Sequence, residues 1–263
     1  TVDLSDVFPG IASIRGFDYL DRVAAFAEGK ITVQDPSSSL AARMASIKPG
    51  DFVLDVCSAP GGKAMHAADL VRGTGMVEAR DVSERKTDLI EENIMRCGFP
   101  NIRTMVWDAT FLDPSMIGQA DVVLADLPCS GLGIIGKKPD IKERMTKDEI
   151  VKLAGLQREI LSVVSQYVKP GGTLVYSTCT ILLPDASRRN VPSSIIWFDS
   201  NESRYRSISL EADEMSLILE ALALFPRTQM VRSRPAVTNP IWLYAISAAS
   251  AKSTNRPRNR PRP

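Results

Sequence analysis

The sequence predicts an α/β fold with a mostly parallel central sheet and helices on both of its faces. Between residues 50 and 180, short apolar segments of strand character alternate with longer segments of helical character. Alternation of this kind is typical of parallel strands that are joined by right-handed helical crossovers. The strands of such a sheet are buried on both faces, and ligands bind at the carboxyl ends of the strands.

The expected elements have recognisable ends. Strands are expected at residues 52–56, 75–79, 102–106, 121–125 and 172–176, and helices at 35–47, 63–71, 83–97 and 146–168. Ser83 and Gly98 suit the two ends of one helix, and Thr146 with Glu149 forms a capping box at the start of another. The Pro-Gly-Gly sequence at 170–172 ends that last helix and turns into the fifth strand.

Four regions are expected along the chain. Residues 1–34 form a lead-in segment, 35–181 the core of the sheet domain, and 182–250 a divergent C-terminal part of that domain. The pattern weakens after residue 180 and leaves the last strands of the sheet undefined, with only a helix near 210–224 and a strand near 241–246 expected. The basic tail at 251–263 is expected to be disordered, and an RNA-gripping arm is the alternative.

Composition narrows the class of protein. A hydrophobic fraction of 44% is ordinary for a globular domain, and no apolar run reaches the roughly 18 residues that cross a bilayer. The net charge of +1 does not by itself indicate a nucleic-acid partner. The 4 cysteines include no C-x-x-C pair, so neither a zinc site nor a disulfide framework is expected. These features predict a cytoplasmic protein without metal or membrane contact, and nothing demands more than a monomer.

The loop after the first core strand is the best candidate for a ligand cradle. It consists of Cys57, Ser58, Ala59, Pro60, Gly61, Gly62 and Lys63. The glycines let backbone amides approach a ligand, and the helix behind them adds a partial positive charge. The spacing matches neither G-x-G-x-x-G nor a P-loop, so a phosphate cradle is the weaker interpretation. A tight strand-to-helix turn is the structural alternative.

Three acids follow at successive strand ends, namely Asp81, Asp108 and Asp126. A carboxylate accepts hydrogen bonds from ribose hydroxyls, from an adenine amino group or from an ammonium group. S-adenosylmethionine carries all three of these groups and no phosphate. A single acid at a strand end is usually a helix cap, but three along one sheet edge favour a nucleoside ligand. The sequence therefore favours a nucleoside ligand, and S-adenosylmethionine fits the three acids.

Two cysteines lie just past neighbouring strand ends and are expected to point into one crevice. Cys129 follows Asp126 closely, and Cys179 follows the fifth strand. A lone cysteine is more often a small buried residue than a nucleophile, but a second thiol and an acid beside it favour chemistry. A thiolate that adds to carbon 6 of cytosine enables carbon 5 to attack a methyl group. Asp126 is placed either to assist at ring nitrogen 3 or to hold the cofactor's amino group.

Four segments in order resemble the motifs of the Sun-type RNA cytosine-5 methyltransferases, and within them the RsmB/Fmu subgroup of bacterial ribosomal RNA enzymes. The segments are 55–63, 126–131, 138–142 and 176–179, while 34–38 and 156–161 also match the subgroup. The resemblance covers about residues 10–181. Four motifs in the same order make a specific signal.

The resemblance implies a Rossmann-like class I methyltransferase that uses S-adenosylmethionine and acts on RNA. The default substrate is 16S ribosomal RNA, and transfer RNA is the runner-up. The resemblance also implies that Cys179 forms a covalent adduct with cytosine and that Cys129 assists release of the product. The family's cofactor residues fall on 57–63, Asp81, Lys86, Asp108 and Asp126.

The chain departs from the family pattern in two places. The subgroup normally has an N-terminal helical RNA-binding domain, for which we expect no room before residue 34, and the acidic stretch and Gly-Phe-Phe strand expected after residue 180 are not in the sequence. Two other interpretations therefore stay open. A methyltransferase for a protein or a small molecule would not need Cys179, and a binding domain would hold cofactor or RNA without turnover.

The remaining polar and aromatic residues receive no firm functional role. His66 is expected to be structural or on the surface, and Cys97 to pack at a helix end. Trp107 and Phe111 suit stacking on a base and core packing equally well. The basic residues of the following loop meet RNA phosphates or form a solvated surface; they are Lys137, Lys138, Lys142 and Arg144.

Overall fold

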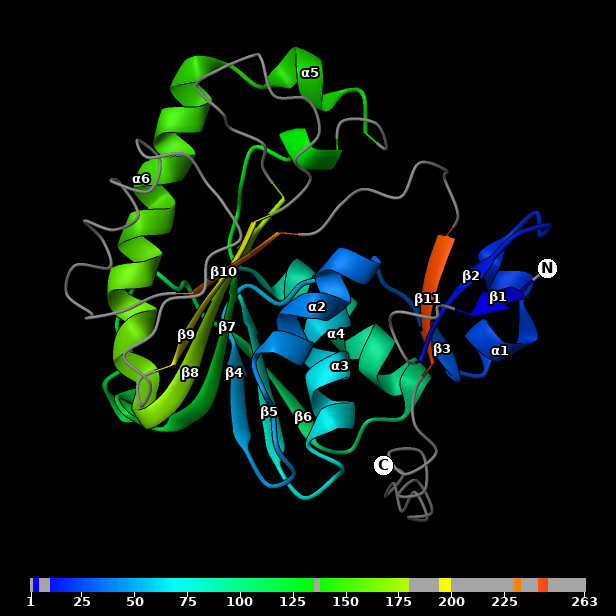
Figure 1. The fold of residues 1–263 in the computed structure, drawn as a ribbon, viewed down its shortest axis with the longest axis horizontal. Coiled ribbons are helices and arrows are strands. Elements are labelled where there is room, and N and C mark those ends of the chain that lie inside the picture. Colours follow the sequence, from blue (N-terminus) through cyan, green and yellow to red (C-terminus); the bar gives the residue numbers. More distant parts are fainter. Residues whose placement is uncertain are drawn as a thin grey trace, which may run out of the picture.

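A seven-stranded sheet forms the centre of the protein (Figure 1). The computed structural model describes residues 2–4, 10–134, 138–179, 194–199, 229–232 and 241–245. The strand order is β10-β9-β8-β7-β4-β5-β6, in which β9 and β10 pair antiparallel and the other five strands are parallel. The strands are β4 (Phe52–Asp55), β5 (Met76–Asp81), β6 (Ile102–Val106), β7 (Ala120–Asp126), β8 (Val168–Thr178), β9 (Ser194–Asp199) and β10 (Gln229–Arg232). The predicted, mostly parallel sheet is confirmed.

Helices cover both faces of this sheet, as predicted. One face carries α2 (Pro36–Met44), α3 (Gly62–Leu70) and α4 (Glu84–Cys97), and the other carries α6 (Lys147–Val164) (Figure 1). Alternate strand residues supply the two cores, because successive side chains point to opposite faces. Val53 packs in the core beneath α2, α3 and α4, whereas its neighbour Leu54 packs in the core beneath α6. Short helical segments also occur between these elements, at α5 (Ile141–Arg144), 20–22, 114–116, 132–134 and 165–167.

The helix ends agree with the predicted caps in part: Ser83 occupies the N-cap position of α4 without a capping hydrogen bond from its side chain, and one bond of the predicted capping box is present. Gly98 ends α4 with a φ of 73°, and the Thr146 hydroxyl accepts a hydrogen bond from the Glu149 amide at 3.2 Å. The predicted helix to residue 168 is wrong at its end, because α6 stops at Val164 and β8 begins at Val168. The Pro-Gly-Gly sequence at 170–172 is a bulge within β8, since the pairing with β7 shifts register there.

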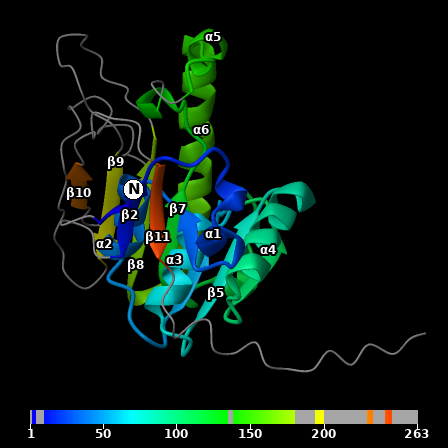
Figure 2. The same cartoon turned by 90° about the vertical axis from the view of Figure 1, so that its right-hand side faces the viewer.

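A second, four-stranded sheet lies beside α4. It contains β1 (Val2–Leu4), β2 (Ile11–Ile14), β11 (Ile241–Ala245) and β3 (Ile31–Val33), and faces the viewer in Figure 2. The strand expected near 241–246 is confirmed as β11, which joins this small sheet. Arg96 of α4 holds the lead-in segment, donating to the carbonyls of Phe26 (2.8 Å) and Ile31 (3.1 Å) around the short helix α1 (Ala24–Ala27). The helix expected near 210–224 and the tail 251–263 lie outside the described residues.

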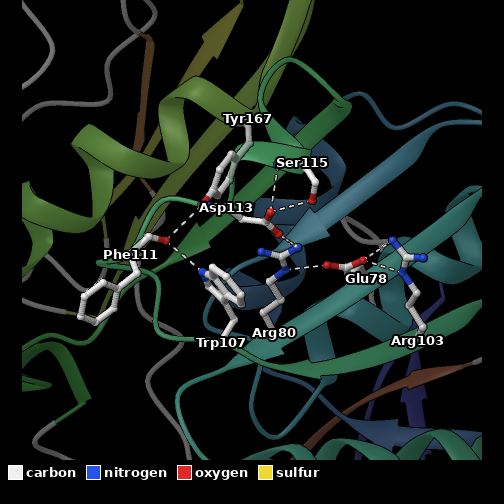
Figure 3. Close-up of polar contacts among 8 residues, drawn as sticks. All are labelled: Glu78, Arg80, Arg103, Trp107, Phe111, Asp113, Ser115 and Tyr167. Carbon is white, nitrogen blue, oxygen red and sulfur yellow. Dashed lines mark hydrogen bonds and ion pairs between the residues drawn. The ribbon is translucent and has the colours of Figure 1, made fainter.

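Charged side chains fill the face of β5 that turns away from α3 (Figure 3). Glu78 is fully buried, and Arg80 is 2% exposed. The guanidinium of Arg80 donates to Glu78 and, at 2.8 Å, to Asp113, and Arg103 of β6 pairs with the other oxygen of Glu78. Burying a charge is costly unless it is paired, and here opposite charges alternate. We call Glu78, Arg80 and Asp113, together with the more exposed Arg103, the buried ion network. No sequence motif indicated it.

Every helix in the described part of the chain is too short or too polar to cross a bilayer. Within the same residues, no group of three His, Cys, Asp or Glu side chains is arranged to hold a metal ion.

Candidate active site

The loop 57–63 makes a tight turn between β4 and α3. The Ser58 amide donates to the carbonyl of Arg80, and the Ala59 amide donates to Asp81 Oδ2 at 2.9 Å. Gly61 has a φ of +99°, and a Cβ on it would lie 3.1 Å from Cγ2 of Ile90. A side chain here would be strained by the backbone conformation and crowded by α4. The turn that the sequence left as the structural alternative is therefore present, and it brings the loop to the carboxyl edge of the sheet.

Unpaired acceptors lie directly beneath this loop. Both carboxylate oxygens of Asp55 and the hydroxyl of Ser58 are buried and make no well-aligned hydrogen bond among the described residues, although the Ser58 hydroxyl and the Cys57 amide lie close enough to Asp55 to lower its pKa. Burial raises the pKa of Asp55 to about 7, although the nearby Lys63 lowers it. Buried polar groups normally find partners. A ligand that brings hydrogen-bond donors fits this set of atoms, as the ammonium and hydroxyl groups of S-adenosylmethionine do.

Asp81 stands at the end of β5 and is held on both oxygens. Its Oδ2 accepts the bond from Ala59, and its Oδ1 accepts from the Val82 amide (2.8 Å) and from Lys86 Nζ (2.9 Å). A carboxylate has about four acceptor positions, so limited capacity for a ligand remains. Of the two predicted residues, Asp81 thus contacts the loop directly, and Lys86 contacts Asp81.

Asp126 connects the loop with the two cysteine segments. Lys63 Nζ lies 2.5 Å from Asp126 Oδ2, and the Ser177 hydroxyl donates to Oδ1 at 2.7 Å. The carboxylate is therefore oriented from both sides, and it is about one-third exposed. Asp108 behaves differently, because it accepts from the amide and hydroxyl of Thr110 in a local turn. No interaction joins Asp108 to the other predicted site residues within the described chain.

The thiols of Cys129 and Cys179 meet at the end of β7 and β8. Their sulfur atoms are 2.9 Å apart, well beyond the ~2.05 Å of a disulfide bond, and both cysteines are free. The amide of Cys179 also donates to Cys129 Sγ at 3.2 Å. The predicted convergence of the two cysteines in one place is confirmed.

The two thiols differ in their tendency to ionise. A hydrogen bond from Cys179 and the amides of Gly131 and Cys179 bring the pKa of Cys129 down to about 7, against the effects of burial and of Asp126. The same shared hydrogen bond, followed by burial, raises the pKa of Cys179 above its ordinary value. When the pair loses one proton, the charge is therefore favoured on Cys129, whose sulfur also accepts from the Cys179 amide. Cys57 stays a thiol, because burial and then Asp55 raise its pKa to about 12.

Several other candidates have structural surroundings. His66 is fully buried, and burial followed by the nearby Arg43 lowers its pKa to about 3, so the structural interpretation is confirmed. Cys97 packs in the core beneath α3 and α4. Trp107 donates to the Phe111 carbonyl and stacks against Arg80, while the Phe111 side chain is exposed. In the basic loop, Lys138, Lys142 and Arg144 are exposed, and Lys137 lies outside the described residues.

Sequence reasoning missed two residues that contact the site. Ser177 lies on β8 and reaches Asp126, and Gln157 of α6 reaches the carbonyl of Pro128 at 2.6 Å. A polar residue two positions before Cys179 was a signal for the first. The motif at 156–161 contained the second, but helical periodicity alone does not indicate where its amide points.

The fold and the edge of the sheet define a class of protein. A parallel sheet in this order, with a glycine-containing loop after its central strand, is the Rossmann-like fold of S-adenosylmethionine-dependent methyltransferases. The solved structure of PH0851 is 38% identical, with a TM-score of 0.66, over 69% of this chain and 41% of that one. The structure of NSun6 from Pyrococcus horikoshii with SFG is 34% identical, with a TM-score of 0.57, over 63% of this chain and 42% of that one.

The family model of the 16S rRNA methyltransferases RsmB/F matches residues 42–220. This chain belongs to that family. A probable ribosomal RNA small subunit methyltransferase B of Bacillus subtilis is 42% identical over 157 residues, which are 59% of this chain and 35% of the relative. The chain thus spans little more than a third of the length of this curated relative.

Proposed function

We propose that this chain transfers a methyl group from S-adenosylmethionine to carbon 5 of a cytosine in small-subunit ribosomal RNA. The observation that carries the proposal is the contact between the Cys129 and Cys179 sulfurs, 2.9 Å apart, beside an Asp126 that is oriented by Lys63 and Ser177. Membership of the RsmB/F family supports the substrate. The relative NSun6, solved with SFG, an analogue of S-adenosylmethionine, supports the cofactor.

The residues that would hold the cofactor are those around the loop. Asp81 and Asp108 offer acceptors for hydroxyl or amino groups, and the backbone of 57–63 closes over the buried acceptors of Asp55 and Ser58. Lys86 orients Asp81. When bound, S-adenosylmethionine supplies an electrophilic methyl group at this edge of the sheet.

The two thiols have different roles in the reaction: Cys179 is the nucleophile and Cys129 accepts its proton. As the Cys179 sulfur adds to carbon 6 of cytosine, its proton passes across the short contact to the Cys129 thiolate, so that no free Cys179 thiolate has to form beforehand. A proton shared between Asp126 and ring nitrogen 3 would neutralise the negative charge that develops there. After carbon 5 has been methylated, its proton must leave to a base, and the bond from carbon 6 to Cys179 then breaks. Cys129 assists this release.

The test compares the parent with Cys179→Ala and Cys129→Ala, using methyl-labelled S-adenosylmethionine and unmodified 16S ribosomal RNA. Label on carbon 5 of cytosine is expected with the parent, none with Cys179→Ala, and a trapped protein–RNA adduct with Cys129→Ala. Methyl transfer that survives Cys179→Ala would refute the two-thiol mechanism. Cofactor binding without transfer by the parent would refute the activity and indicate a binding domain, and transfer only to transfer RNA would correct the substrate.

A further inference from the structure

Gln157 lies on α6, outside both cysteine loops, yet it touches the chain next to each of them. Its amide nitrogen donates to the carbonyl of Pro128 at 2.6 Å, and its amide oxygen accepts from the hydroxyl of Tyr176 at 2.9 Å. A primary amide has one donor side and one acceptor side, so the two bonds together set its orientation. The side chain therefore spans two segments of the active-site edge.

The two anchors are close to the two thiols along the chain. Pro128 immediately precedes Cys129, and Tyr176 is a buried residue of β8 shortly before Cys179. Movement of either anchor relative to the other would change the separation of the sulfurs. The bond from Gln157 to each anchor resists that movement.

Strand pairing alone does not hold the segment that carries Cys129. The last bond between the two strands runs from the Leu127 amide to the Ser177 carbonyl at 3.1 Å. Pro128, the next residue, has no amide proton with which to continue the ladder. Its carbonyl is bound by Gln157 instead, at the point where the strand ladder stops and the cysteine loop begins.

We propose that Gln157 is a positioning residue, which keeps Cys129 in contact with Cys179 by holding Pro128 and Tyr176 in a set relation. Its importance for catalysis rests on the proposed function, because there the proton of Cys179 passes to Cys129. Its effect on the thiols does not depend on RNA. The thiol contact is therefore the direct readout of this role.

Loss of the contact should make Cys129 harder to ionise. The hydrogen bond from Cys179 is the largest influence that lowers the pKa of Cys129, and the amides of Gly131 and Cys179 also lower it. Burial and the charge of Asp126 act in the opposite direction. If Cys179 moves away, only the Gly131 amide still lowers the pKa of Cys129 against burial and Asp126, so the fraction of Cys129 thiolate at neutral pH should fall.

The test is the pH dependence of Cys129 alkylation by iodoacetamide, followed by peptide mass spectrometry on the whole chain. The parent should show a midpoint near pH 7, and Gln157→Leu should shift it up to about 8.5 or higher, the range of an ordinary cysteine. Tyr176→Phe, which removes only one of the two bonds, should shift it less. Gln166→Leu is the matched control, because Gln166 is an exposed glutamine just beyond the same helix that bonds only to Ser162 through its side chain.

Methyl transfer gives the second readout. Gln157→Leu should lower kcat about 10-fold or more and leave the KM for S-adenosylmethionine unchanged, since misplacement affects the thiols and not the cofactor loop. Thermal unfolding of each variant separates this loss from a loss of folding, and Tyr176→Phe decides the question if Gln157→Leu does not fold.

The outcomes separate the two proposals. An alkylation midpoint that stays at the parent value in both Gln157→Leu and Tyr176→Phe would overturn the positioning role, whatever the activity. A shifted midpoint in a chain whose parent form methylates no RNA would support the positioning role and refute the proposed function. A shifted midpoint with a fall in kcat would support both.

Discussion

Two clusters of charged residues lie on the same central sheet, and they satisfy their charges in different ways. In the buried ion network, Arg80 lies between Glu78 and Asp113, so that each buried charge faces an opposite one. At the carboxyl edge, Asp126 is paired with Lys63, but the fully buried Asp55 has no cation bound to it and makes no well-aligned hydrogen bond among the described residues. The network pairs its charges with one another, although Arg80 Nη1 lacks a hydrogen-bond partner in the described part of the chain, whereas the edge keeps a buried acid and an uneven pair of thiols that a ligand can contact.

The largest expected effect concerns the edge. Asp126→Asn keeps the size of the side chain but removes the charge that faces Lys63 and the reacting ring. We expect methyl transfer to fall by about 100-fold to 10,000-fold, the range that general acid–base groups contribute, with little change in the free energy of unfolding. Single-turnover transfer and denaturant unfolding measure the two quantities. A variant that transfers methyl groups at the parent rate would remove Asp126 from the reaction.

The next expected effect is a loss of stability without a loss of activity. Arg80→Met leaves Asp113 and one oxygen of Glu78 without their buried cation. The free energy of unfolding should fall by about 3–5 kcal/mol, while the transfer rate per folded molecule stays at the parent value. Arg103→Met is the control, because that side chain is 58% exposed and should contribute far less. Equal losses from both variants would contradict the distinction between buried and exposed pairs.

The third effect, the smallest for each pH unit, appears in the pH dependence of stability. The pKa of Asp55 is about 7 in the folded protein and 3.8 ordinarily, so the folded state keeps a proton that the unfolded chain releases in this interval. Stability should therefore fall as pH rises from about 4 to 7, by roughly 1.4 kcal/mol per pH unit at most from this group. Asp55→Asn removes this loss, and its advantage over the parent should grow from pH 4 to pH 7. A difference that does not vary with pH would show that Asp55 ionises normally.

Some elements of the fold can be predicted from a few neighbouring residues, and others cannot. Strands such as 102–106 and helix ends such as Gly98 and Thr146 were predicted because periodicity and caps are encoded within a few residues. The end of α6 was predicted too late, because the bulge at 170–172 depends on pairing with β7. Strand β11 was predicted by position, but only pairing with β2 and β3 assigns it to the small sheet.

For the candidate site, the sequence by itself determined the residue types, their order and their place after strand ends. The cysteines, the acids and the loop 57–63 can be assigned to one site from the sequence, because parallel strands bring their carboxyl ends to one edge. Only the tertiary structure decided that Ser177 and Lys63 share Asp126, that Gln157 spans the cysteine segments, and that Asp108 turns to Thr110 instead. The ion pairs around Glu78 and Arg80 were likewise not predicted from the sequence. Such contacts join residues that are distant in sequence, and their geometry depends on how strands and helices pack, which no local pattern specifies.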